Sequence, residues 1–169
     1  MSATPVAGSG STVESPTSGP SLRGRLGALE RWAVVYARIA LGAAFLSGIA
    51  SRFGLWGEHV GYGNFAKFVK YTAEVNSFMP ASTIPFLAWA ATVAELVLGI
   101  GLVVGVGLRW VALASALLLV LFGTAMAISF GIKEPLDYSV FSAAAAALLL
   151  ALRPPHKPSA HQQPNPFTH

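Results

Sequence analysis

The sequence predicts an all-α membrane protein, a bundle of four transmembrane helices with an amphipathic interfacial helix in its first outer loop. Three observations predict this class. Of the 169 residues, 54% are hydrophobic and only 11% are charged, too few charges to cover the surface of a soluble domain. The apolar residues gather in four long runs, and none of these runs alternates as barrel strands do. Backbone groups in lipid must pair internally, so the runs are expected to be helices.

The four runs fit a bilayer, whose hydrocarbon core of about 30 Å needs about 20 helical residues. The predicted spans are residues 32–50, 83–106, 110–130 and 136–152. The first contains one charge, Arg38, the second contains Glu95, and the third contains none. The fourth is the shortest and carries Asp137 at its start, so its first turn is expected at the membrane interface. Together the spans predict a transmembrane domain over residues 31–153.

The two ends of the chain differ from this domain in composition. Residues 1–30 and 154–169 are predicted to be disordered cytoplasmic tails, because their outer parts are rich in Ser, Thr, Gly and Pro and offer little apolar surface to bury. An alternative makes the first run a cleaved signal peptide. That run is long, starts at residue 32 and carries Arg38, none of which is typical of a signal core.

Basic residues flank the runs unevenly. Four crossings would place one group of them on one side: Arg23, Arg25, Arg31, Arg109, Arg153 and Lys157. The other side would hold Arg52, Lys67, Lys70 and Lys133. Because cytoplasmic loops carry the excess of Lys and Arg, both termini are expected in the cytoplasm, with the domain in the plasma or inner membrane. The same bias explains the basic pI, so the charge does not indicate a nucleic-acid partner.

The long loop at residues 51–82 contains a second kind of helical pattern. Asn64 can cap a helix, and Phe65, Phe68, Val69 and Thr72 then share one face, opposite Lys67, Lys70 and Glu74. The pattern predicts an amphipathic helix on the outer membrane surface. Two roles remain open for it, a lid over the bundle and a docking surface for a partner.

Arg38 and Glu95 are the charges whose positions need an explanation. A charge at the bilayer centre costs about 2.5–3.5 kcal/mol or more, so it normally faces the bundle interior and has a partner. The two are therefore predicted to form an intramembrane pair, packed by the small residues Gly42, Ala91 and Gly99. Arg52 and Arg109 are secondary candidates. Three roles stay open for the pair: fixing helix register, binding a polar group such as a quinone headgroup, and proton coupling.

Other chemistries lack the residues they require. The chain has no cysteine, so it cannot perform thiol exchange or hold an iron–sulfur cluster through its own thiolates. Its four histidines lie in loops or tails rather than in the predicted spans, and no metal site is expected. The glycines at 99–107 do not fit the dinucleotide-binding pattern and follow a membrane helix rather than a strand.

Two segments resemble the DoxX family of small membrane proteins. The first, ARIALGAAFLSGIASRFG, has the family pattern at Arg38, Gly42, Phe45 and Gly48. The second, AELVLGIGLVVGVGLRW, has it at Glu95, Gly99, Leu102, Gly105 and Arg109. The resemblance spans residues 33–152. Arg52 stands near a position where the family often has a lysine.

The resemblance implies a membrane subunit or anchor of a quinone-linked redox complex, in sulfur or oxidative-stress metabolism. Relatives include the small subunit of a thiosulfate:quinone oxidoreductase. It implies a non-catalytic chain, with quinone as the possible cofactor and the lipid bilayer, a soluble oxidoreductase subunit or another copy as partners. The alternative is a small proton-coupled transporter, in which Glu95 would be the carboxylate that alternates between the two sides.

Overall fold

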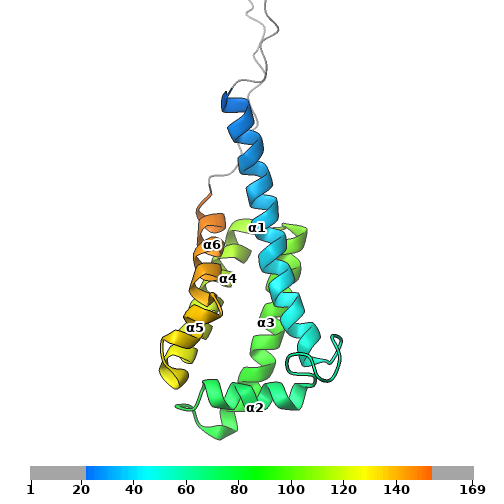
Figure 1. The fold of residues 1–169 in the computed structure, drawn as a ribbon, viewed down its shortest axis with the longest axis vertical. Coiled ribbons are helices and arrows are strands. Elements are labelled where there is room, and N and C mark those ends of the chain that lie inside the picture. Colours follow the sequence, from blue (N-terminus) through cyan, green and yellow to red (C-terminus); the bar gives the residue numbers. More distant parts are fainter. Residues whose placement is uncertain (1–21, 154–169) are drawn as a thin grey trace, which may run out of the picture.

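A computed structural model describes residues 22–153, and every regular element in that range is a helix (Figure 1). The elements are α1 (Leu22–Arg52), α2 (Phe65–Val75), the 3-10 turn η1 (Ala81–Thr83), α3 (Ile84–Val104), α4 (Leu108–Phe130), α5 (Lys133–Asp137) and α6 (Val140–Leu152). Three helical segments are long and apolar enough to cross a membrane: Gly24–Arg52, Ala81–Val104 and Leu108–Phe130. The all-α class is confirmed, and these three segments coincide with the first three predicted spans.

The fourth predicted span, residues 136–152, differs from the structure. It is interrupted at Tyr138 and Ser139, and Ser139 adopts a φ of 55°, a backbone region that ends a right-handed helix. On one side of the break lies the short α5, within which Lys133 pairs with Asp137. On the other side α6 has 13 residues, about 20 Å of helix. The helix expected to run through this region is therefore two helices.

The predicted tail at residues 1–30 is wrong for residues 22–30, which form the first turns of α1. Leu, Ala, Arg and Glu in this stretch are good helix formers, and they extend a helix already nucleated in the next segment. Glu30 is also fixed by Arg153, at the end of α6, with 2.9 Å between Oε1 and Nη2. The predictions for residues 1–21 and 154–169 lie outside the described residues.

The helices associate as two close pairs, α1 with α3 and α4 with α6. A Cβ added at Gly42 would lie 2.7 Å from Val103 Cγ2, and one at Gly123 would lie 2.7 Å from the ring of Phe141. Helices can approach this closely only where a side chain is missing. Leu41, Leu102, Ala147 and Leu150 belong to the buried core that joins the pairs.

The two pairs are closed at one end by α2, which runs across the base of the bundle in Figure 1. A helix begins after Asn64 as predicted, and Asn64 caps it, because Asn64 Oδ1 accepts a hydrogen bond of 2.9 Å from the backbone N–H of Lys67. Phe68, Thr72 and Val75 are the buried residues of this helix. Its apolar face thus packs toward α3 and α4, and the helix covers the end of the bundle.

Candidate functional site

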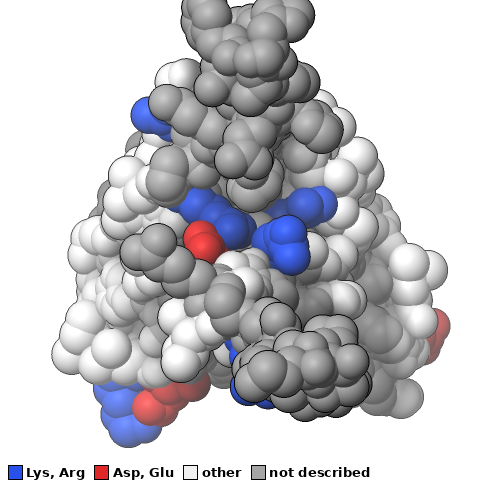
Figure 2. Space-filling model, turned by 90° about the horizontal axis from the view of Figure 1, so that it is seen from above, with Lys and Arg blue, Asp and Glu red and all other residues white. Residues whose placement is uncertain are grey.

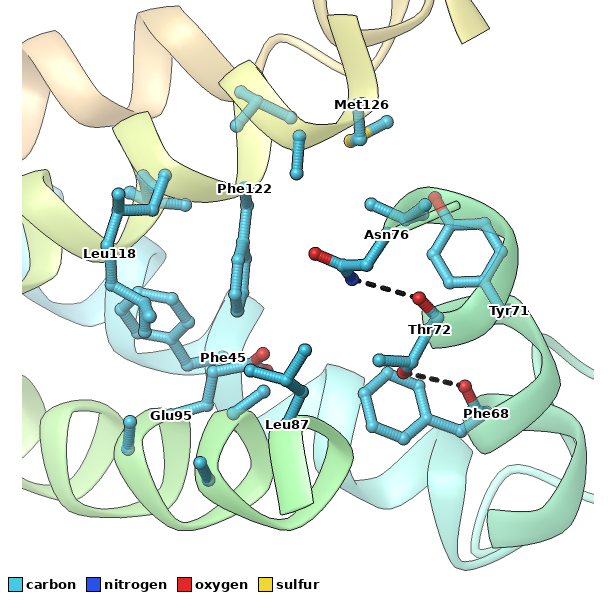
Figure 3. Close-up of a pocket in the computed structure, with 18 of the residues that line it drawn as sticks. Phe45, Phe68, Tyr71, Thr72, Asn76, Leu87, Glu95, Leu118, Phe122 and Met126 are labelled. Atoms are coloured by element: carbon cyan, nitrogen blue, oxygen red, sulfur yellow. Dashed lines mark hydrogen bonds between the residues drawn. The ribbon is translucent and has the colours of Figure 1, made fainter. Parts of the chain in front are cut away.

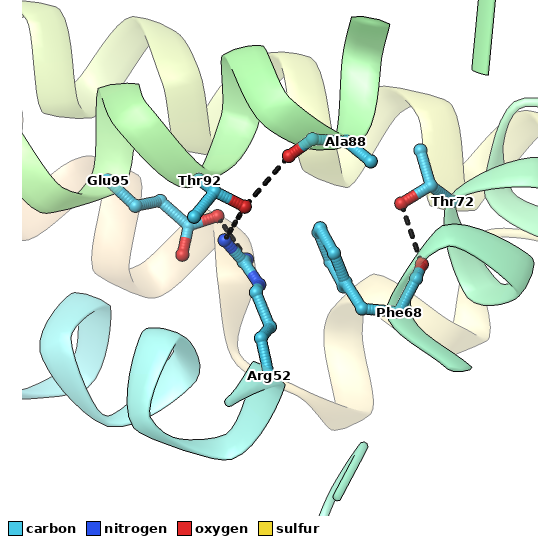
Figure 4. A network of polar contacts seen from close by, with 6 residues as sticks. All are labelled: Arg52, Phe68, Thr72, Ala88, Thr92 and Glu95. Atoms are coloured by element: carbon cyan, nitrogen blue, oxygen red, sulfur yellow. Dashed lines mark hydrogen bonds and ion pairs between the residues drawn. The ribbon is translucent and has the colours of Figure 1, made fainter. Parts of the chain in front are cut away.

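The predicted ion pair of Arg38 and Glu95 is wrong, because Glu95 pairs with Arg52 instead. Arg52 is the last residue of α1, and its Nη2 lies 2.6 Å from Glu95 Oε1 (Figure 4). Its Nη1 donates a hydrogen bond of 3.1 Å to Thr92 Oγ1, on the same face of α3. Each side chain of the ion pair is only 5% exposed. A secondary candidate from the sequence is therefore the actual partner of the intramembrane carboxylate.

Arg38 reaches the other end of α3. Its Nε donates to the carbonyl of Leu102 and its Nη2 to that of Val103, both at 3.0 Å. The last carbonyls of a helix have no partner within it, and a guanidinium supplies both hydrogen bonds and a favourable charge there. Val103 lies eight residues beyond Glu95, about 12 Å along the helix. That separation, together with the better partner close by, explains why Arg38 does not reach the carboxylate.

The surroundings of Arg52 fix its guanidinium in one orientation. The ring of Phe68, on α2, lies under it with its centroid 3.7 Å from Cζ. Thr92, which accepts from Arg52, donates its own proton to the carbonyl of Ala88 at 2.8 Å. The Nε of Arg52 is buried and has no hydrogen-bond partner within residues 22–153. The guanidinium is therefore held by Glu95, Thr92 and Phe68, with Nε enclosed by the protein.

Gly48 on α1 leaves space for the carboxylate of the pair. A Cβ at Gly48, one turn before Arg52, would lie 3.3 Å from Glu95 Oε2. A Cβ at Gly42 would lie 2.9 Å from the carbonyl oxygen of Gly99, and one at Gly99 would lie 3.1 Å from Leu46. The predicted packing residues Gly42 and Gly99 thus lie at the crossing of α1 and α3, near Arg38 rather than around Arg52.

A cavity of about 560 Å³ lies beside the pair, between the two helix pairs and under α2. Its walls are mainly apolar, and Figure 3 shows Phe45, Leu87, Leu118, Phe122 and Met126 around it. Ala90 on α3 and Leu121 on α4 line it and are also exposed on the side of the bundle. The cavity therefore reaches the lateral surface between α3 and α4, the surface that lipid would cover.

One end of this cavity is polar. Arg52 and Glu95 line it, as do Tyr62, Tyr71 and Asn76, and the Asn76 carboxamide points inward in Figure 3. Burial raises the pKa of Tyr62 well above its ordinary value of 10.0, with a further contribution from Tyr71. Burial likewise raises the pKa of Tyr71. Both tyrosines therefore keep their hydroxyl protons and can donate hydrogen bonds into the cavity.

The raised tyrosine pKa values predict loss of stability at alkaline pH. The neutral phenol is favoured in the folded state, so the contribution of Tyr62 is fully present below its unfolded pKa of 10.0. It declines as the pH rises from there towards the higher folded pKa, because the unfolded chain then releases its proton first. Thermal unfolding in detergent should show this decline, and Tyr62→Phe should reduce it. An identical alkaline profile in the variant would contradict the assignment.

An aromatic cluster holds α2 and the preceding loop over the cavity. Tyr62 lies with its ring centroid 5.1 Å from Phe68 and 5.3 Å from Tyr71, and Phe65 lies 4.5 Å from Trp89 on α3. The loop reaches this position through glycines at positive φ. One of them is Gly63, where a Cβ would meet the carbonyl oxygen of Glu58 at 2.1 Å.

The remaining predicted residues lie in different places. Ala91 lines the cavity from α3. Arg109 is exposed at the far end of the bundle, with its guanidinium 5.9 Å from the ring of Trp110. Sequence reasoning did not assign Tyr62 or Asn76 to the site, nor any residue of α4. No cluster of three His, Cys, Asp or Glu side chains that could hold a metal occurs among the described residues.

The end of the bundle opposite α2 is rich in basic residues. The start of α1, the turn between α3 and α4 and the end of α6 bring Arg25, Arg31, Arg109 and Arg153 to it. Figure 2 looks onto this end and shows blue basic side chains close to its centre, beside a red acidic one. The buried pair is therefore separated from the basic end by most of the bundle length.

The apolar helices and the buried charges within them define a multi-pass helical membrane protein. The family model for DoxX matches residues 33–131, more than half of the chain, and the chain belongs to the DoxX family. The matched region begins in α1 and ends just after α4, so it includes both residues of the ion pair. Comparison with curated proteins and with solved structures gave no match.

Proposed function

We propose that this chain binds a quinone in the cavity beside Arg52 and Glu95, as the membrane subunit of a redox complex. The observation that carries the proposal is the cavity itself. It has apolar walls, a polar end and access from the lateral surface between α3 and α4. An amphipathic molecule dissolved in the bilayer could enter a site of this kind without crossing water. Its volume of about 560 Å³ falls within the range of small-molecule sites.

The residues present fit a quinone ring. The apolar walls suit the ring and the first part of its isoprenoid tail, and the ring carbonyls need hydrogen-bond donors. The Tyr62 and Tyr71 hydroxyls and the Asn76 amide are donors of this kind, and these residues line the polar end of the cavity. When bound, the quinone would supply the redox chemistry, while these residues would orient its headgroup.

A partner would have to supply the electrons. The chain has no cysteine, and no side chain in its described part can be assigned as a redox group. We therefore propose that a soluble oxidoreductase subunit docks on the membrane protein. By the positive-inside rule, the basic end faces the cytoplasm of a plasma membrane. With both termini in the cytoplasm, α5 and α6 together would make the fourth crossing of the membrane.

The alternative function, a proton-coupled transporter, would use Glu95 as its carrier. An intramembrane carboxylate is a default candidate for such a role. However, Arg52 holds Glu95 in a contact of 2.6 Å, so release of the carboxylate would require breaking a buried ion pair. This cost favours the quinone site.

Binding of a short-chain quinone to the protein in nanodiscs would test the proposal, with tryptophan fluorescence as the readout. We expect saturable binding that Ala125→Phe weakens by at least about tenfold, because Ala125 lines the cavity and the added ring would occupy it. Ala145→Phe is the matched control, since Ala145 is exposed on α6 and does not line the cavity. Binding that does not saturate, or equal weakening by both substitutions, would overturn the proposal.

A second measurement separates the two functions. Proteoliposomes containing the wild-type chain and the Glu95→Gln variant would be compared for flux driven by a pH gradient. The quinone site predicts no such flux in either protein. A flux that the substitution abolishes, together with an absence of saturable quinone binding, would establish the transporter instead.

A further inference from the structure

The N-terminal turns of α1 extend beyond the bundle. The helix has 31 residues, about 46 Å, whereas the hydrocarbon core is about 30 Å thick. The ion pair between Glu30 and Arg153, at the end of α6, marks the level at which α1 leaves the other helices. In Figure 1 the turns before this level stand clear above the rest of the bundle. About 15 Å of helix therefore projects beyond the hydrocarbon core.

The projecting part carries an exposed leucine stripe. Leu22, Leu26 and Leu29 are 78%, 57% and 65% exposed. The stripe continues down the same face through Ala33, Tyr36 and Ala40, all exposed, with spacings of four and three residues in alternation. This is the heptad pattern of a two-stranded coiled coil, with Leu22 and Leu29 at positions d and Leu26 at position a. Lipid cannot cover the upper leucines if they project beyond the acyl chains.

The projecting turns continue a helix that is already nucleated inside the bundle, so they can fold without a partner. Three exposed leucines on one face remain unfavourable in water, and a second helix would bury them. Lower on the face, Ala33, Ala40 and Ser47 are small and exposed, which allows a second helix to approach closely inside the membrane. The same face is therefore suited to one continuous helix–helix contact, above and within the bilayer.

Charges beside the stripe indicate which helix could fill this face. In the heptad register Arg25 falls at position g and Glu30 at position e of the next heptad. In a parallel coiled coil, a residue at g meets the residue five positions later, at e, on the other helix. Arg25 of one copy would meet Glu30 of a second copy, and the contact would occur twice. Glu30 binds Arg153 through Oε1, and its side chain is 64% exposed. Glu30 can therefore also contact Arg25 of a second copy.

We propose that the chain forms a parallel homodimer through this face of α1, with Leu22, Leu26 and Leu29 at the centre of the contact. Two copies inserted by the same charge rule have the same orientation in the membrane, so their first helices are parallel as the register requires. This dimer is independent of the proposed quinone site, whose cavity is lined by α1 residues from Leu41 onward. The pairing of Arg25 with Glu30 distinguishes a second copy from a different protein as occupant.

Single-cysteine cross-linking in native membranes tests the contact, since the natural chain has no cysteine. Leu22→Cys, Leu26→Cys and Leu29→Cys are each expected to give disulfide-linked dimers under mild oxidation. Arg31→Cys and Val35→Cys are the controls, because these residues are exposed but fall at positions f and c, away from the seam. Absence of dimers at the leucine positions, or equal cross-linking at the controls, would overturn the proposal.

A charge exchange tests the pairing independently of the leucines. Arg25→Glu alone and Glu30→Arg alone would each place like charges together in a homodimer, so each should dimerise less than the wild type. Co-expressed with different tags, the two variants should associate with one another severalfold more than either does with itself, because both contacts are restored. Equal homomeric and mixed association would contradict the register. Cross-linking of Leu29→Cys only to another protein would replace the homodimer with a heteromeric complex.

Discussion

Replacing Arg52 by alanine is expected to lower the free energy of unfolding by about 3–5 kcal/mol. The substitution leaves Glu95 without its counter-charge in a site where the carboxylate side chain is 5% exposed. It also removes the hydrogen bond to Thr92 and the stacking on Phe68, which holds α2 to the end of α1. Reversible unfolding in mixed micelles would measure the loss, with helical circular dichroism as the signal.

Two controls distinguish the effect of breaking a buried ion pair from the effect of removing any charge. Lys133→Ala breaks an exposed pair with Asp137, and exposed pairs contribute about 0–1 kcal/mol. The double substitution Arg52→Met and Glu95→Met replaces both charges by apolar side chains, so it should recover most of the stability lost by the single change. Similar losses for Arg52→Ala and Lys133→Ala would show that the Arg52–Glu95 pair is not a buried, desolvated contact.

The sequence was sufficient to predict those elements that depend on local pattern. Hydrophobic length predicted α1, α3 and α4, because an apolar run in a bilayer has no other way to satisfy its backbone. The amphipathic pattern and the cap at Asn64 predicted α2, because both signals lie within the helix or directly before it. The break at Ser139 was not predicted, because its φ of 55° reflects how α5 and α6 pack and has no signature in composition.

The partner of Glu95 could not be predicted from the depth of each charged residue in the membrane alone. Arg38 and Arg52 lie on the same helix, and both have side chains long enough to reach across to α3. The choice between them depends on where α1 and α3 cross and on which other acceptors are near each guanidinium. Arg38 finds the carbonyls of Leu102 and Val103, which are invisible in a count of charged side chains. If the free carbonyls at a helix C-terminus are counted as hydrogen-bond acceptors, the sequence favours Arg38 at the end of α3.

The cavity depends on still longer-range information. Its walls come from α1, α2, α3, α4 and α6, and the α4 residues that line it are all apolar types that would also suit a lipid-facing surface. Tyr62 enters it from the loop before α2, and that loop is folded by glycines at positive φ, among them Gly61 and Gly63. Only the arrangement of the helices distinguishes Phe122 in the cavity from an exposed Phe86.

The second large effect is expected at the crossing of α1 and α3. Gly42→Ala should lower the free energy of unfolding by about 1–3 kcal/mol, as overpacking of a tight interior does. The added Cβ would lie 2.7 Å from Val103 Cγ2 and 2.9 Å from the carbonyl oxygen of Gly99. The valine can move slightly, but the carbonyl oxygen belongs to the α3 backbone, so the two helices would have to separate.

The same substitution elsewhere on α1 provides the matched control. A Cβ at Gly27 would meet nothing within 4 Å, and alanine favours a helix over glycine by about 0.5–1 kcal/mol. Gly27→Ala should therefore stabilise the protein slightly, whereas Gly42→Ala destabilises it. Separation of α1 from α3 would also displace Arg52, ten residues further along α1, so Gly42→Ala should weaken quinone binding as well. Equal stability changes at the two glycines would mean that α1 and α3 do not meet at Gly42, and the position of Arg52 against Glu95 would lose its structural basis.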